Sequence, residues 1–215
     1  MKKILFLVLA VILAAPVSYQ PLNAAWKTPL EKALAKQYKK KLKEFKKDGW
    51  KLSGSSSTLE VALLQHYDKL AKGDVQELVA TVDHFKSKNV GQQVVLNNAC
   101  VIYARQAGSF LRGRVNSDLN YNGDDVAAEF DKMYSAYESL VEKEIRGELK
   151  QSFTLIKDNG DGTYSMESYF LVDEDSASRA RIKAMEQAAR ESGLAQEYAR
   201  MVGEFVREGF SSEPE

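Results

Sequence analysis

The clearest alternation of apolar and polar residues lies between residues 145 and 172. In its first half the apolar parity consists of Ile145, Gly147, Leu149, Phe153 and Leu155. In its second half the apolar parity consists of Tyr164, Met166, Phe170 and Val172. A period of two is typical of half-buried β-strands. Between the halves, Asp158-Asn159-Gly160-Asp161-Gly162 has the composition of a tight reversal. The pattern therefore predicts a β-hairpin.

Apolar residues at helical spacing predict long helices on both sides of this hairpin. The first begins near Thr28-Pro29, carries Leu34, Tyr38 and Phe45 on one side, and ends at Gly49. A second begins at Ser57, which has capping-box spacing to Glu60. Others are expected over about residues 90–115, 125–141 and 173–209, and Gly193 is either a kink or a break in the last.

A third strand is predicted from Glu77 to Phe85, with Leu78, Ala80 and Val82 on one side. The small residues Ala99, Ala104, Ala107 and Gly108 should let another element approach the helix over residues 90–115 closely. We therefore predict a helix-rich α+β fold, with a small antiparallel three-stranded sheet and long helices packed against one face.

The N-terminus has the pattern of a secretory signal. Lys2 and Lys3 precede an apolar run from Ile4 to Ala15, and small residues follow up to Ala24-Ala25. The run is short for a membrane span, and no cysteine lies near the cleavage region to carry a lipid. The expected organisation is a signal peptide over residues 1–25, a basic helix and linker over 26–56, one α+β domain over 57–210 and a disordered tail over 211–215. The expected location is periplasmic or secreted.

Charge changes this picture only locally. Without Lys2 and Lys3, 28 basic residues face 30 acidic ones, so the balance does not point to nucleic acid. The segment from Lys27 to Lys51 nevertheless contains ten lysines, the two end residues included, opposed by Glu31, Glu44 and Asp48. This segment is either a cationic face for acidic surfaces such as anionic lipid, or a solvated outer face. Contact with an anionic membrane surface would use Lys39, Lys40 and Lys43.

Several segments resemble one bacterial group. They are residues 99–111, the G-E-L-K-Q-S-F strand, the G-T-Y-S-M-E-S-Y-F-L-V-D-E return arm and the alanine-rich helix after it. Over roughly residues 75–210 the chain resembles the envelope proteins typified by the twenty-kilodalton surface lipoprotein, without their acylated cysteine. The resemblance implies a compact α+β envelope domain with a non-enzymatic function.

Signatures of catalysis are sparse. The sequence has no GxSxG, Walker, GxGxxG or HExxH motif, and its only histidines are His66 and His84. Each histidine is either an ordinary residue or the base of an exported hydrolase with a neighbouring carboxylate. Cys100, the single cysteine, lies among apolar residues, where a thiol packs as a small hydrophobe. We therefore expect no catalytic residue and no organic cofactor.

One spacing fits a calcium loop. Asp118-Leu119-Asn120-Tyr121-Asn122-Gly123, followed by Glu129, matches D-x-N-x-N-G-x5-E. The oxygen ligands would come from Asp118, Asn120, Asn122, Asp124 and Glu129. The other interpretation is an Asn-Gly turn followed by Asp124 or Asp125 capping a helix.

Together these features predict an exported, non-catalytic envelope or secreted protein, which serves as a structural or partner-binding module. Its partner would be another envelope component or a second copy of the chain. The alternatives are a calcium-stabilised extracellular module and an exported hydrolase.

Overall fold

The computed structural model describes residues 29–73, 75–118 and 124–209, which form six helices and four strands. The N-terminal half contains α1 (Pro29–Lys47), β1 (Lys51–Ser53), α2 (Leu59–Ala71), β2 (Val75–Phe85) and α3 (Lys88–Asp118). The C-terminal half contains α4 (Asp124–Ile145), β3 (Lys150–Asp158), β4 (Tyr164–Asp173), α5 (Glu174–Ser192) and α6 (Gln196–Glu208). The α+β class is confirmed.

The sheet has four antiparallel strands in the order β1-β3-β4-β2, so the prediction of three strands is wrong. The additional strand, β1, pairs Lys51–Ser53 with residues 154–156 of β3. Three residues are too short to show a period of two, and pairing with β3 is what makes this segment a strand. The predicted hairpin forms β3 and β4, and Gly160 and Gly162 in its turn have positive φ.

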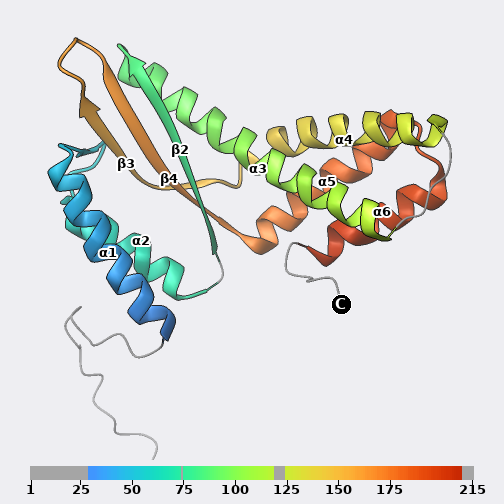
Figure 1. Ribbon diagram of the computed structural model, residues 1–215, viewed down its shortest axis with the longest axis horizontal. Coiled ribbons are helices and arrows are strands. Elements are labelled where there is room, and N and C mark those ends of the chain that lie inside the picture. The colour runs from blue at the N-terminus through green and yellow to red at the C-terminus, as the bar shows by residue number, and fades with distance from the viewer. Residues whose placement is uncertain (1–28, 74, 119–123, 210–215) are drawn as a thin grey trace, which may run out of the picture.

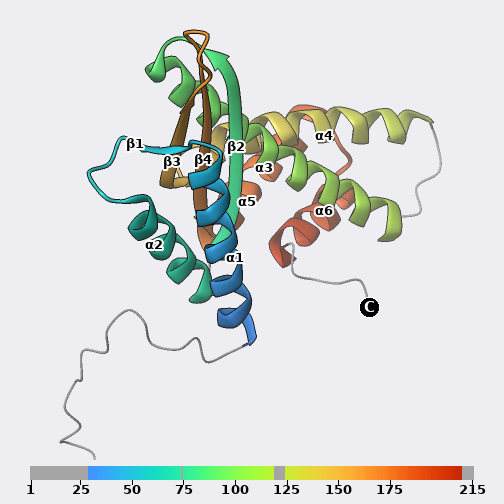
Figure 2. The same ribbon diagram turned by 60° about the vertical axis from the view of Figure 1, so that its left-hand side comes forward.

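Helices cover both faces of the sheet, although the sequence pattern placed them on one (Figures 1 and 2). On the face toward α1 and α2, Phe153 stacks on Tyr169 with ring centroids 4.3 Å apart. On the face toward α3, the buried strand residues include Leu78, Met166 and Phe170. Adjacent residues Tyr169 and Phe170 thus belong to two different hydrophobic cores.

Burial of both faces also encloses Thr154, whose parity the alternation assigned to solvent, and Ser168, a polar residue on the apolar parity of its strand. Thr154 and Ser168 are buried opposite one another, and their hydroxyl oxygens lie 2.7 Å apart in a hydrogen bond. A buried hydroxyl without a partner would be costly. Their mutual hydrogen bond lets this polar pair occupy the centre of the sheet.

The long helix α3 joins the two parts of the molecule. Its 31 residues span about 46 Å, from the sheet into a bundle with α4, α5 and α6 (Figure 1). The predicted small residues Ala99, Ala104, Ala107 and Gly108 are buried, and the Glu138 side chain of α4 packs directly over Gly108. Gly193, with φ +74°, ends α5, so it is a break rather than a kink. No helix in the described ranges has the length and apolarity needed to cross a bilayer.

Caps define two helix starts. Thr58, not the predicted Ser57, caps α2, because its side chain accepts a hydrogen bond from the backbone N–H of Val61. Asp173 caps α5 through a 2.9 Å hydrogen bond from the Ser176 N–H. That bond, helped by Lys150, holds the pKa of Asp173 at about 2.

Two glycines of α3 test the packing against the sheet. A Cβ at Gly91 would lie 2.6–2.8 Å from ring carbons of Phe85, whereas a Cβ at Gly113 would meet nothing within 4 Å. We expect Gly91→Ala to lower the free energy of unfolding by about 1–3 kcal/mol through overpacking. Gly113→Ala should raise it by about 0.5–1 kcal/mol by restricting the unfolded chain. Urea unfolding measures both, and equal effects would contradict the Phe85 contact.

The Asp173 cap should make stability depend on pH. A carboxyl group whose pKa is lower in the folded state contributes stability above its unfolded pKa and loses it as the pH falls. For Asp173 this loss should occur between about pH 4 and about pH 2. Asp173→Ala should cost about 0.5–2 kcal/mol at pH 7. The difference between wild type and Asp173→Asn, measured by urea unfolding over this pH range, should shrink toward pH 2; a constant difference would contradict the assignment.

Candidate functional site

Helix α1 docks on the protein through a narrow apolar stripe. Leu34 and Phe45 are buried, and Tyr38 meets Tyr67 of α2 edge-on with ring centroids 6.2 Å apart. Phe45 makes a similar edge contact with Tyr169 of β4. After α1, Trp50 is partly buried and packs against the same core. These contacts fix which side of α1 faces solvent.

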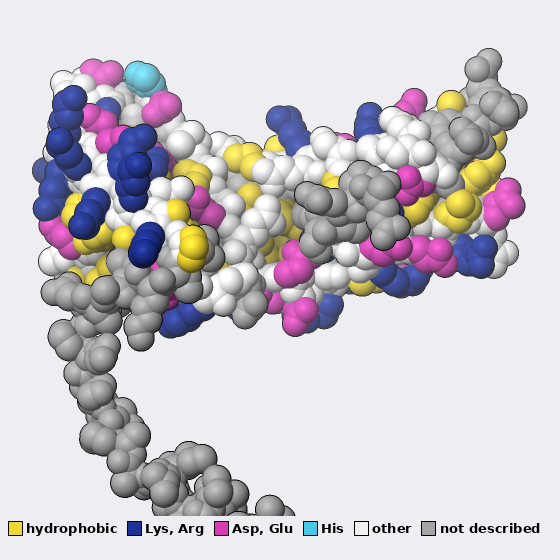
Figure 3. Space-filling model, turned by 60° about the horizontal axis from the view of Figure 1, so that its bottom comes forward, with side chains coloured by type: hydrophobic (Ala, Val, Ile, Leu, Met, Phe, Trp, Pro, Cys, Tyr) yellow, Lys and Arg dark blue, Asp and Glu magenta, His cyan; other side chains and the backbone are white. Residues whose placement is uncertain are grey.

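One arc of the solvent side of α1 is formed by lysines alone. At about 100° per residue, every position between residues 32 and 47 that falls in one arc of about 120° is a lysine. We call this arc the lysine ridge, and all seven of its members are exposed: Lys32, Lys36, Lys39, Lys40, Lys43, Lys46 and Lys47. Figure 3 shows basic side chains gathered over this end of the molecule. The ridge contains the predicted contact residues Lys39, Lys40 and Lys43.

Few carboxylates neutralise the ridge. Lys40 lies 3.8 Å from Glu44, and Lys46 pairs with Glu60 of α2, which lowers the pKa of Glu60. The remaining five lysines make no ion pair with a carboxylate in the described part of the chain. Exposed pairs of this kind contribute little to stability. The ridge therefore presents net positive charge to its surroundings.

A groove of about 480 Å³ lies between α1 and the sheet. Its lining includes the carboxylates Glu44, Glu77 and Glu167 and the phenols Tyr67 and Tyr169. Burial raises the pKa of Tyr67 to about 12, with smaller contributions from Glu77 and Glu44. Burial and the hydrogen bond to Glu167 also raise the pKa of Tyr169. Lys40 and Lys41 also line the groove, so three carboxylates face two lysines there and its charge is mixed, unlike that of the ridge.

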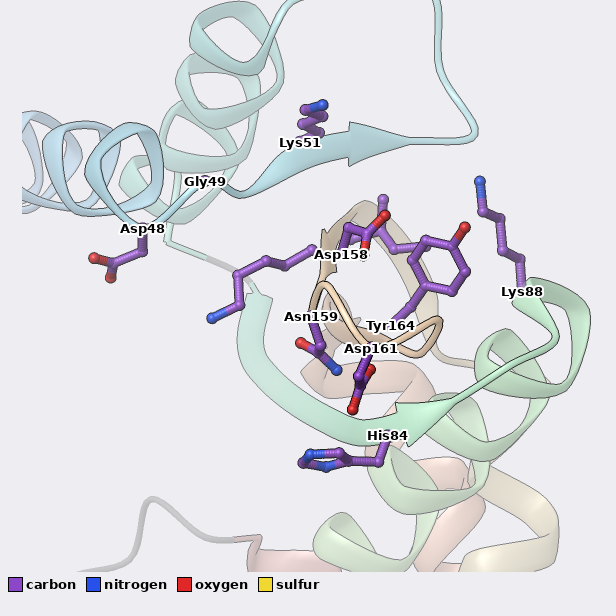
Figure 4. Close-up of a pocket in the computed structure, with 11 residues that line it drawn as sticks. Asp48, Gly49, Lys51, His84, Lys88, Asp158, Asn159, Asp161 and Tyr164 are labelled. Carbon is purple, nitrogen blue, oxygen red and sulfur yellow. The ribbon is translucent and has the colours of Figure 1, made fainter.

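A second depression, of about 900 Å³, lies at the tip of the β3–β4 hairpin. Figure 4 shows that its charged side chains come from several segments and do not converge on one point. Asp158 and Asp161 are bound within the turn, through the N–H groups of Gly160 and Thr163. His84 is exposed on its rim with φ +56°, at a bulge of β2. The depression has mixed charge and no convergent set of catalytic groups.

His66, by contrast, is fully buried in a hydrogen-bonded chain. Its Nε2 lies 2.6 Å from Glu77 Oε1 and its Nδ1 lies 3.0 Å from Ser152 Oγ. Because a carboxylate only accepts hydrogen bonds, Nε2 carries a hydrogen. The rings of Tyr67, Phe153 and Tyr169 surround the imidazole edge-on at 5.3–5.5 Å. The chain links α2 to β2 and β3 across β4.

A serine, a histidine and a glutamate in series have the composition of a nucleophile–base relay. The histidine of such a relay must also donate its proton to the leaving group of the substrate, however, and His66 has 0% of its surface exposed. We therefore assign the His66 chain a structural role, as a polar cross-link within a hydrophobic core. Cys100 is equally enclosed, and burial raises the pKa of its thiol.

The predicted calcium loop lies largely outside the described residues, which exclude Asn120, Asn122 and the side chain of Asp124. Asp118 ends α3 and lies 3.2 Å from Arg114 Nε, and Glu129 is half-buried on α4. Among the described residues, no group of three or more metal-binding side chains converges. Calcium binding by Asp118, Asn120, Asn122, Asp124 and Glu129 stays a prediction.

The sequence did not reveal the His66 cross-link, since Ser152 is 86 residues away from His66. For the ridge, the helical spacing of the lysines was a sufficient signal.

We found no match between this chain and any protein-family model, curated protein or solved structure. The resemblance to surface lipoproteins stays a prediction, and function has to be inferred from the chemistry of the surface.

Two measurements distinguish a structural role of His66 from a catalytic one. We expect His66→Ala to lower the free energy of unfolding by about 2–4 kcal/mol, because it leaves a cavity and removes two hydrogen bonds. The exposed His84→Asn should change it by less than about 0.5 kcal/mol. A fluorophosphonate probe should leave Ser152 of the wild type unlabelled in mass spectrometry. Labelling of Ser152 that His66→Ala abolishes would contradict the structural assignment.

Proposed function

We propose that this protein is an exported, non-catalytic envelope or secreted module that binds an acidic envelope component through the lysine ridge of α1. The observation that carries this function is the ridge itself: seven exposed lysines occupy one arc, and none of its positions is acidic. A merely solvated face needs no such segregation of sign, since mixed charges hydrate as well and pair with one another.

Export is supported by the N-terminal sequence, where Lys2 and Lys3 precede the apolar run from Ile4 to Ala15. The non-catalytic part is supported by the enclosure of His66 and Cys100, the two groups with the most evident chemistry. Binding through the ridge would be electrostatic. It should therefore weaken as salt is added, because salt ions screen charges that lie in solvent.

The role of the ridge can be tested with two variants that each lose three lysines, one inside the ridge and one outside it. Lys39, Lys40 and Lys43 become Gln in one variant, and the exposed Lys69, Lys132 and Lys143 of α2 and α4 become Gln in a matched control. At about 1 kcal/mol per lysine, the first variant should bind bacterial envelope fragments about 100-fold more weakly at low salt. The control should keep most of the affinity. Co-sedimentation measures both, and similar losses would mean that net charge, not the ridge, determines binding.

A further inference from the structure

Beyond its charge, the lysine ridge has a shape that narrows the choice of partner. Its lysines follow the outer side of α1 from residue 32 to residue 47, a length of about 22 Å. The opposite side of the helix is turned toward α2 and the sheet (Figure 2). The ridge is therefore straight and convex. We infer that its partner is a flat layer of anionic phosphate-bearing lipid headgroups, on which α1 lies parallel to the surface. This inference rests on the proposed function.

The chemistry of the ridge favours headgroups over a dissolved polyanion. All seven members are lysines, which act as hydrated point charges, and α1 contains no arginine that could bind a phosphate through two parallel hydrogen bonds. Sites that hold a single anionic chain use grooves and aromatic platforms as well as charge. The arc between residues 32 and 47 contains no aromatic residue.

The surroundings of α1 point the same way. A flexible polyanion loses conformational freedom when it is held along a convex surface, and extra contacts have to offset that loss. The nearest groove offers an anion only Lys40 and Lys41 beside the three carboxylates Glu44, Glu77 and Glu167, so it adds no net attraction. Lipid headgroups are already concentrated in one plane and can diffuse to each lysine separately. The ridge suits a partner that requires no wrapping.

When α1 lies on the lipid headgroups, its apolar side stays buried inside the protein. Leu34 and Phe45 are 8% and 4% exposed, and the Phe45 ring contacts Tyr169 of the sheet. An amphipathic helix that enters a bilayer needs a free apolar face. In α1 that face is occupied, so contact is confined to the headgroups and should be fully reversed by salt.

The test uses the purified mature chain over residues 26–215 with three probes: phosphatidylcholine vesicles containing phosphatidylglycerol, pure phosphatidylcholine vesicles, and soluble polyphosphate at equal total phosphate. The expected result is binding to the anionic vesicles alone, with complete release at high salt. Lys39→Gln, Lys40→Gln and Lys43→Gln together should weaken vesicle binding about 100-fold, at about fivefold per lysine. The Lys69, Lys132 and Lys143 control should not.

Other results would overturn the inference in distinguishable ways. Equal affinity for polyphosphate would assign the ridge to acidic polymers and would leave the proposed function intact. Binding to envelope fragments but not to anionic vesicles would likewise exclude lipid as the partner while keeping that function. Vesicle binding that survives high salt would show insertion and contradict a docked α1. Failure to bind vesicles, polyphosphate and envelope fragments alike would overturn both proposals.

Discussion

Burial of the β3–β4 hairpin on both faces is the constraint on which the rest of this structure depends. Because side chains alternate along a strand, Tyr169 and Phe170 must enter different cores. Neither core can form without the same hairpin, so α1 and α2 on one face and the α3–α6 bundle on the other are coupled through it. Polar residues of the hairpin are enclosed as well, which is why Thr154 and Ser168 hydrogen-bond to each other.

Each core contains one large polar side chain that is fully buried and hydrogen-bonded. In the smaller core, His66 links Glu77 and Ser152. In the larger core, Arg181 of α5 donates to the Tyr103 hydroxyl at 2.6 Å and pairs with Glu174. A buried charge without such partners would be strongly destabilising. These directional contacts fix the position of α2 and α5, which hydrophobic packing alone would specify less narrowly.

The candidate function follows from how α1 completes the smaller core. Its apolar stripe packs against Tyr67 and Tyr169, so the arc of lysines is necessarily turned outward. In the groove beside α1, Glu44, Glu77 and Glu167 face Lys40 and Lys41, so uncompensated positive charge is concentrated on the outer side of the helix. A rigidly docked helix with a straight row of lysines presents a surface of defined orientation, whereas an undocked helix would present its charge and its apolar residues together.

Local patterns in the sequence determined most elements of this protein. Helical spacing predicted the helices, the Asp-Asn-Gly-Asp-Gly turn predicted the hairpin, and the lysine spacing predicted a basic face, because each depends on residues near in the chain. The tertiary structure alone decided that β1 is a strand, that both faces of the sheet are covered, and that His66 meets Ser152 and Glu77. β1 is too short to have a period, and a strand flanked by two cores does not have to alternate. A contact between residues 66 and 152 has no signature in the local sequence pattern. Which residues meet there is determined by the packing of the elements that carry them.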